Sequence, residues 1–344
     1  MVLRSGTFGL YLCVVFLASS CGKPRLYFGI CHGPERGKCL PIEECVEELG
    51  FVQAKDSAEC FHTVCCLQTR LAYSQSMKDY CNSDPKPHIS NGELANIREF
   101  PWMAMLLYGD RLLPKCGGSL VGKKWVLTAA HCVPSMENHE EKLRLVRLGV
   151  WDVRQTKDCR GPNCTPPPED FPIERAIVHE LYRPYGTIGT NTEKHSNDIA
   201  LLLLGRVVTY TQFIQPICLP PLFIPSRKDV YADYNLTIAG WGRTNGLSVT
   251  TSTVKIKAQV NGWSTESCKK QYSDVTWGQM CAGGGATMKG SCFGDSGGPV
   301  MDDNQLVGII SLGGSNCGSD RTPMVVTRVD TFMGWLAQHM QFSL

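Results

Sequence analysis

The sequence predicts an all-β fold of sandwich or barrel architecture, preceded by a small module held together by disulfides. Beyond residue 88, short apolar segments alternate with clusters of Gly, Pro, Asn and Asp, as in proteins built from many short strands. Six cysteines lie between Cys31 and Cys66, in a segment too short to bury a large core without covalent links. The predicted strands include residues 125–132, 143–151, 199–205, 235–242, 253–260 and 305–313.

The C-terminal end of the chain follows a different pattern. Phe332, Trp335, Leu336 and Met340 recur at the spacing of one helical face, after the last predicted strand. We therefore expect a C-terminal helix.

The overall composition excludes several classes of partner. The 344 residues are 43% hydrophobic and carry a formal net charge of +2. This is enough apolar material for a large core and about two domains. It gives neither the basic surface that binds nucleic acid nor a polybasic patch for a membrane, so we expect neither partner.

Residues 1–22 have the layout of a secretory signal peptide. A basic start is followed by an apolar stretch from Gly9 to Ala18 and then by small residues. The stretch is too short to cross a bilayer core of about 30 Å, and no later segment approaches 18 consecutive apolar residues. We expect the mature protein to be secreted and extracellular.

The cysteine count predicts a disulfide framework for a secreted chain. Of the 18 cysteines, Cys13 lies in the signal peptide, and a cut before Lys23 removes Cys21 as well. Sixteen cysteines then remain, an even number that permits eight bridges without a free thiol. The alternative keeps Cys21 as an odd thiol for an intermolecular bond.

Cysteine density and polarity divide the chain into parts. Residues 23–66 form the disulfide-rich module, and residues 67–88 are polar without helical or strand periodicity, which is typical of a linker. Residues 89–344 contain the strand pattern and form the β domain.

Three short motifs carry the residue types that amide hydrolysis by a hydroxyl requires. That chemistry needs a serine in a tight turn, an imidazole base, a carboxylate that orients the base, and N–H groups facing the oxyanion. The sequence offers TAAHC with His131, NDIALL with Asp198 and GDSGGP with Ser296, in this order. The glycines beside the serine allow the tight backbone that aims successive N–H groups at one point.

The motifs and their order resemble the chymotrypsin family of serine proteases over the whole β domain. The resemblance implies two six-stranded antiparallel β-barrels with a C-terminal helix. It implies that His131 is the general base, that Asp198 orients it, and that Ser296 is the nucleophile of an acyl-enzyme mechanism. The N–H groups of Gly294 and Ser296 would form the oxyanion hole, Ser311 would support Asp198, and no metal or organic cofactor would take part.

The resemblance also implies a disulfide pattern. The implied pairs in the β domain and linker are Cys81–Cys218, Cys116–Cys132, Cys268–Cys281 and Cys292–Cys317. Cys159 and Cys164 then remain, close enough for a small surface loop. The N-terminal module resembles the clip domain of arthropod proteases in its cysteine spacing and closing doublet, which implies Cys31–Cys65, Cys39–Cys60 and Cys45–Cys66.

Clip-domain proteases generally act in extracellular cascades such as melanization or Toll activation. The resemblance therefore implies an arthropod cascade enzyme in haemolymph, with protein substrates, an upstream activating protease and a serpin-type inhibitor as partners. The alternative is a non-catalytic homologue that acts as a cofactor or scaffold, since a blocked pocket can abolish turnover with the triad intact.

Activation is expected at an unusual site. The run ISNG from Ile89 stands where family members have the segment that becomes their amino terminus. The resemblance implies a cut between His88 and Ile89, after which the new terminus pairs with Asp295. Because Lys86 is followed by Pro87, a trypsin-like activator is disfavoured, and we expect an activator that accepts histidine.

The expected substrate pocket lacks a charge for basic residues. Gly290 stands six residues before the serine, where trypsin-like members carry aspartate, so a buried substrate guanidinium would be left unpaired. Ser311 and Gly313 are expected in one wall, and Met324 replaces a usual glycine and should fill part of the pocket. We expect cleavage after apolar residues. Asp320 in a nearby loop is the alternative source of negative charge.

Two further features complete the predictions. Asn235 begins a glycosylation sequon, and Asn163 begins a poorer one with a central cysteine. Val150 stands where relatives usually have a calcium-binding glutamate, so we expect no calcium site.

Overall fold

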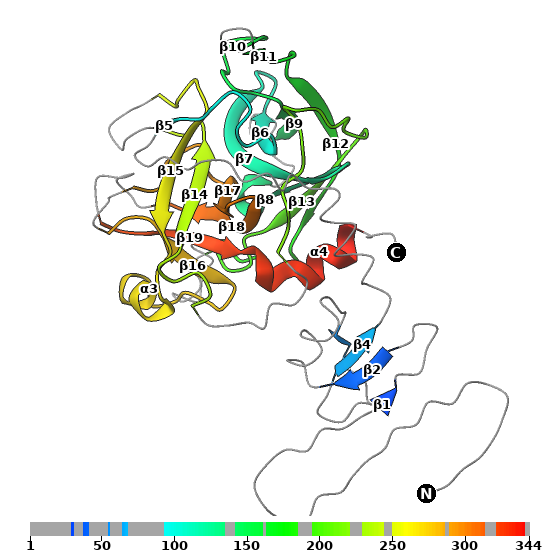
Figure 1. The fold of residues 1–344 in the computed structure, drawn as a ribbon, viewed down its shortest axis with the longest axis vertical. Helices are drawn as coiled ribbons and strands as arrows, with labels where there is room; N and C mark the ends of the chain where they lie inside the picture. The colour runs from blue at the N-terminus through cyan, green and yellow to red at the C-terminus, as the bar shows by residue number, and fades with distance from the viewer. Residues whose placement is uncertain are drawn as a thin grey trace, which may run out of the picture. The chain divides into compact units, whose positions relative to one another are not determined.

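The computed structural model divides the chain into two compact units (Figure 1). It describes residues 29–30, 37–40, 54–55 and 64–67 as backbone, and residues 93–134, 142–160, 163–184, 195–220, 229–243, 250–285, 289–313 and 321–340. One unit comprises Met1–Asp79, Pro221–Arg227 and Met333–Leu344, and the other comprises Tyr80–Pro220 and Lys228–Phe332. The second unit carries the motifs that predict catalysis.

The first unit contains a small antiparallel sheet with strand order β1-β2-β4-β3. Its strands are β1 (Gly29–Ile30), β2 (Gly37–Leu40), β3 (Ala54–Lys55) and β4 (Val64–Leu67). The backbone register places Cys39 opposite Cys65. The three disulfides predicted for this module lie outside the described side chains.

The second unit begins with a closed antiparallel barrel of order β12-β13-β8-β7-β6-β9. Its strands are β6 (Met103–Tyr108), β7 (Leu113–Gly122), β8 (Trp125–Thr128), β9 (Leu143–Leu148), β12 (Glu169–Val178) and β13 (Ala200–Leu204). Phe171, Leu106, Leu120, Leu127 and Leu201 lie on these strands and are almost completely buried. Each buried side chain of this size stabilises the fold by about 1.5–3 kcal/mol.

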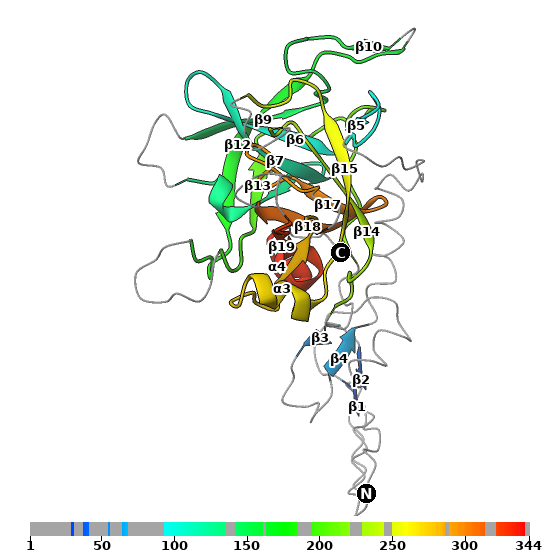
Figure 2. The same cartoon turned by 90° about the vertical axis from the view of Figure 1, so that its left-hand side faces the viewer.

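A second sheet of order β16-β19-β18-β17-β14-β15-β5 follows. Its strands are β5 (Glu93–Leu94), β14 (Asn235–Gly240), β15 (Ile256–Asn261), β16 (Gln279–Ala282), β17 (Pro299–Asp302), β18 (Gln305–Leu312) and β19 (Met324–Arg328). Its buried cluster includes Leu236, Val260, Val300 and Val326. Figures 1 and 2 show this sheet beside the first barrel in both views.

The second sheet closes less completely than a six-stranded barrel. Among the described residues, its two ends meet at one isolated bridge between Gly262, just after β15, and Ala282 in β16. At the other end of β15, Ile256 and Lys257 pair with Leu94 and Glu93 of β5. The added strand occupies part of the edge that full closure requires, so the fold is all-β as predicted but its second barrel is joined at a single point.

The remaining elements are short. They are η2 (Ala130–Cys132), β10 (Cys159–Arg160), β11 (Asn163–Cys164), α3 (Thr265–Gln271), η3 (Val329–Phe332) and α4 (Met333–Met340). The predicted C-terminal helix is present, but its buried residues are Met333, Leu336 and Met340. Phe332 belongs to η3 instead, and Trp335 is only half-buried, with its ring 4.8 Å from that of His339 between centroids and tilted by 60°.

Three of the predicted disulfides lie within the described residues: Cys116–Cys132, Cys159–Cys164 and Cys268–Cys281. Cys218 and Cys292 are also disulfide-bonded. Their predicted partners, Cys81 and Cys317, lie outside the described residues.

The two further sequence features have clear locations. Asn235 is exposed at the start of β14, and its amide donates a 2.9 Å hydrogen bond to Gln259. Val150 is buried. The side chain of Asn163 lies outside the described part of the chain.

Candidate active site

The pairing of β8 with β13 brings His131 and Asp198 together. Thr128 lies opposite Ala200 in this antiparallel ladder. Residues just after β8 and residues just before β13 therefore lie at the same end of the barrel. His131 follows β8 in η2, and Asp198 lies two positions before the start of β13.

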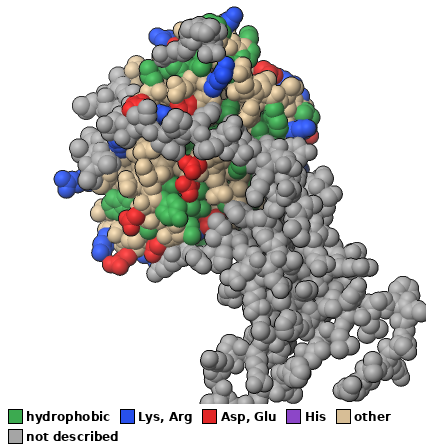
Figure 3. All heavy atoms as spheres, in the orientation of Figure 1, with side chains coloured by type: hydrophobic (Ala, Val, Ile, Leu, Met, Phe, Trp, Pro, Cys, Tyr) green, Lys and Arg blue, Asp and Glu red, His purple; other side chains and the backbone are tan. Residues whose placement is uncertain are grey.

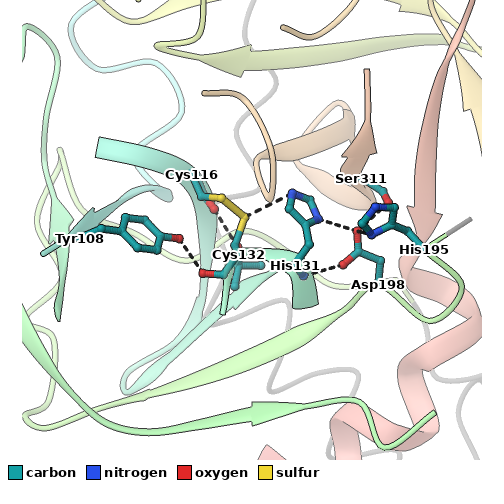
Figure 4. The surroundings of a disulfide bond; sticks show 9 residues. Tyr108, Cys116, His131, Cys132, His195, Asp198 and Ser311 are labelled. Carbon is teal, nitrogen blue, oxygen red and sulfur yellow. Dashed lines mark hydrogen bonds and ion pairs between the residues drawn. A yellow bond between two sulfur atoms is a disulfide. The ribbon is translucent and has the colours of Figure 1, made fainter. Parts of the chain in front are cut away.

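Asp198 is the centre of a hydrogen-bond network (Figure 4). Its carboxylate lies 2.7 Å from His131 Nδ1, and it accepts a 2.9 Å bond from the His131 backbone N–H. The Ser311 hydroxyl donates to the same carboxylate at 2.6 Å. Burial alone would raise the pKa of Asp198, but His131 and these hydrogen bonds lower it below its ordinary value. The ionised carboxylate favours a proton on His131 Nδ1, which leaves Nε2 as an acceptor.

Ser296 lies in a glycine-rich turn between β16 and β17, at the boundary with the first barrel. Gly294 and Gly297 have φ values of 99° and 76°, in the region that favours glycine. A β-carbon at Gly297 would collide with Thr128 and Gly117. Gly117 also donates a 2.8 Å backbone bond to the carbonyl of Ser296, which ties the turn to β7.

The hydroxyl of Ser296 is not engaged by the imidazole. Within the described residues, Ser296 Oγ makes no hydrogen bond, and His131 Nε2 lies 3.7 Å from Cys132 Sγ. The N–H groups of Gly294 and Ser296 also donate to no described group. In contrast, the N–H groups of Asp295, Gly297 and Gly298 donate hydrogen bonds to backbone carbonyls. The two predicted oxyanion donors are thus available to a ligand.

Asp295 is a buried carboxylate without a basic partner among the described residues. It accepts hydrogen bonds from the backbone N–H groups of Gly242, at 2.8 Å, and Cys292, at 3.0 Å. A β-carbon at Gly240 or Gly242 would strike the carboxylate, so both glycines make room for it. Burial raises the pKa of Asp295 to about 6, although the two backbone bonds act in the opposite direction.

The predicted pocket residues differ in their surroundings. A β-carbon at Gly290 would meet nothing within 4 Å, and the neighbouring Ser291 hydroxyl is buried without a partner among the described groups. Gly313 is exposed next to Ser291, while Ser311 is engaged by Asp198. Met324 is 1% exposed and belongs to the core cluster of the second sheet. His88, Ile89 and Asp320 lie outside the described residues.

A second histidine next to the triad was missed by the sequence reasoning. His195 Nδ1 lies 4.0 Å from Asp198 Oδ2, and the rings of His195 and His131 are 5.4 Å apart between centroids. The hydroxyl of Tyr182 lies 3.0 Å from His195 Nδ1. Burial lowers the pKa of His195, and the charge of Asp198 opposes this shift. Its position three residues before Asp198 was the available signal.

Comparison with known proteins agrees with this geometry. Residues 89–336 match the family described as Trypsin. The Spaetzle-processing enzyme of Drosophila melanogaster is 32% identical, over 92% of this chain and 93% of its own length. CLIP domain-containing serine protease HP8 of Bombyx mori is 33% identical, over 90% of this chain and 93% of its own.

The chain belongs to the clip-domain serine proteases of the trypsin family. It is a serine endopeptidase. Phenoloxidase-activating factor 3 of Holotrichia diomphalia is a further relative, 34% identical over 89% of the protease and 92% of its own length. Among solved structures, mouse neuropsin, a serine protease, aligns over 73% of the chain and 100% of its own with 29% identity and a TM-score of 0.60.

Two surface findings accompany the identification. No described helix of the protease is both long and apolar enough to cross a membrane. On the face in Figure 3, acidic and basic side chains are interspersed rather than gathered into one basic area.

Proposed function

We propose that the chain is a secreted zymogen in which His131, Asp198 and Ser296 form the catalytic triad. His131 accepts the proton of Ser296 while the serine oxygen attacks the peptide carbonyl, and Asp198 holds the imidazole and stabilises its charged form. The N–H groups of Gly294 and Ser296 stabilise the oxyanion. The observation that carries this proposal is the carboxylate network that holds His131 and Ser311 on Asp198.

Activation is proposed to occur by cleavage between His88 and Ile89. The buried carboxylate of Asp295, without a basic partner among the described residues, supports this step because a buried charge is costly until it is paired. The freed amino group of Ile89 would supply that charge. Pairing would reorganise the adjacent turn and allow Ser296 to engage His131.

The segment that follows Ile89 is already anchored in the uncleaved chain. Ala95 N–H donates to the carbonyl of Lys255 at 3.0 Å, and the buried Glu99 pairs with Lys257 at 2.7 Å. Trp151 also donates a 2.7 Å bond to the carbonyl of Ala95. Besides the reorganisation of the Ser296 turn, the proposed activation therefore moves only the few residues between the cut and this anchor.

The proposed specificity is for apolar residues before the cut bond. Gly290 contributes no charge to the expected pocket base, and the nearby Ser291 offers a neutral hydroxyl. Burying a substrate guanidinium there would cost several kcal/mol for an unpaired charge. Met324 packs in the core cluster of the second sheet and is an uncharged side chain.

The proposed domain order is a signal peptide at 1–22, a clip domain at 23–66, a linker with the activation site at 67–88 and the protease domain at 89–344. The names of the relatives, which include melanization protease 1 of Drosophila melanogaster, support a role in an extracellular cascade of arthropod immunity. The proposed partners are protein substrates, an upstream protease that accepts histidine and a serpin-type inhibitor. The protein would be found in haemolymph.

The test replaces residues 85–88 by an enterokinase site, so that cleavage frees Ile89 without the natural activator. The cut chain should label with a serine-reactive fluorophosphonate, and the uncut chain and a cut Ser296→Ala variant should not. Ser296→Ala should lower turnover by at least about 10⁴-fold. A peptide library should show cleavage after apolar residues. No labelling of the cut chain would overturn catalysis, and a strong preference for arginine would overturn the specificity.

A further inference from the structure

The side chains of His131, His195 and Asp198 form a cluster with the chemistry of a zinc site. One ligating atom from each residue lies within 4.8 Å of the other two. Two imidazoles and a carboxylate are a common ligand set for Zn²⁺, with water as the fourth ligand. Figure 4 shows both imidazole rings next to the carboxylate of Asp198.

The distances in the cluster are close to those of a metal centre. His195 Nδ1 and Asp198 Oδ2 are 4.0 Å apart, and His131 Nδ1 and the same oxygen are 2.7 Å apart. In a tetrahedral site with bonds of about 2.0–2.1 Å, ligand atoms are separated by about 3.3 Å. Because all three atoms lie within 4.8 Å of one another, shifts of up to about 1.5 Å would bring the three ligands to that spacing.

The surroundings also suit a divalent cation. The Ser311 hydroxyl donates to Asp198 and orients its carboxylate, whereas the Tyr182 hydroxyl lies 3.0 Å from His195 Nδ1, where the ion would take its place. A hydrogen bond to a metal-ligating carboxylate commonly fixes its orientation. The other candidate cluster contains Cys116 and Cys132 with His131, but its two cysteines form a disulfide and offer no thiolate.

We propose that Zn²⁺ binds His131, His195 and Asp198 and thereby inhibits the protease. A neutral imidazole has one nitrogen lone pair available, so binding of Zn²⁺ at His131 Nδ1 moves the ring proton to Nε2. With Nε2 protonated, His131 can no longer accept the proton of Ser296. The ion therefore acts as an inhibitor. It is not a cofactor of catalysis, for which the sequence predicts no metal. Inhibition rests on the proposed function, whereas the binding itself does not.

Binding is tested on the full-length, uncut Ser296→Ala chain, which cannot digest itself. Titration calorimetry with ZnCl₂ should give one ion per chain, and MgCl₂ should give no binding because Mg²⁺ prefers oxygen ligands. Adding His195→Asn should weaken Zn²⁺ binding by more than about 100-fold, since loss of even an outer partner costs about 10–100-fold. Asparagine suits this position, because His195 has a φ of 50°.

The matched control is His179→Asn, which removes a histidine that lies outside the cluster, against Phe332. This variant should bind Zn²⁺ as the parent does. Absence of binding in the parent, or equal binding after His195→Asn, would overturn the proposal.

Inhibition is tested separately on the cut wild-type chain. Its activity in chelator-treated buffer tests the proposed function, and added ZnCl₂ should then remove the activity reversibly. Cut His195→Asn should keep its activity at the same concentration. If the cut chain is inactive without Zn²⁺, the proposed function fails while calorimetry still decides the metal site. Equal inhibition of both chains would refute the assigned ligands.

Discussion

The two buried aspartates of the site, Asp198 and Asp295, have opposite electrostatic environments. Asp198 is held by His131 and Ser311, and these partners lower its pKa in spite of complete burial. Asp295 accepts only backbone hydrogen bonds among the described groups, and burial raises its pKa to about 6. Identical side chains thus favour different protonation states because of the partners that surround them.

The difference divides the site into two parts. One part contains His131 and Asp198, and the other contains Ser296 and Asp295. The first barrel positions His131 and Asp198 through the ladder between β8 and β13, which needs no further event. The second sheet holds Ser296 beside the carboxylate of Asp295, which has no basic partner among the described residues. Under the proposed activation, this is the part of the site that cleavage would complete.

The largest expected effect comes from replacing Asp198. In the activated enzyme, Asp198→Asn should lower kcat by about 10⁴-fold with little change in KM, because an amide favours the wrong tautomer of His131. Steady-state kinetics on a peptide substrate measure this. Ser311→Ala is the control, since it removes only one 2.6 Å hydrogen bond and should cost less than about tenfold. A kcat within tenfold of wild type for Asp198→Asn would contradict the assigned role.

A smaller effect is expected from replacing Asp295. In the cut chain, Asp295→Asn should lower kcat/KM by about 10²–10³-fold, since losing one partner of a buried ion pair costs about 3–5 kcal/mol. The same substitution should not destabilise the uncut chain, where no cation is paired with Asp295 among the described residues. Kinetics of the cut chain and thermal melting of the uncut chain give the two readouts. Full activity of the cut variant would exclude pairing between Ile89 and Asp295.

Sequence reasoning succeeded where short motifs carry the geometry. The strands around TAAHC and NDIALL were predicted, and the structure joins His131 to Asp198. The catalytic roles of these residues stay predictions. The closure of the second sheet was not predicted in detail, because the pairing of Leu94 with Ile256 depends on contacts between residues far apart in sequence.

The contact of His195 with Asp198 was not predicted, for a different reason. Its imidazole reaches Asp198 from a left-handed backbone conformation with a φ of 50°, which residue type alone does not indicate. Nor does the sequence show that Ser296 Oγ makes no hydrogen bond to His131 among the described residues. Motifs identify which groups take part but do not show when they are aligned.

The smallest expected effect is on stability and sharpens the contrast between the aspartates. Asp295 has an ordinary pKa of 3.8 that folding raises to about 6. Between these values the folded uncut chain binds more protons than the unfolded chain, so stability falls as pH rises and levels off above about 6. The loss should be about 3 kcal/mol, from a shift of about two pKa units.

Denaturant unfolding of the uncut Ser296→Ala chain at pH 4 and pH 7 measures this loss. The same chain with Asp295→Asn is the matched control, since every other titrating group is shared and cancels in the comparison. The asparagine variant should gain about 3 kcal/mol relative to its parent between the two pH values. Asp198 contributes in the opposite direction, because its lowered pKa makes stability fall at acid pH, but this contribution is common to both chains. Identical pH dependence of the two chains would show that Asp295 is already paired before cleavage.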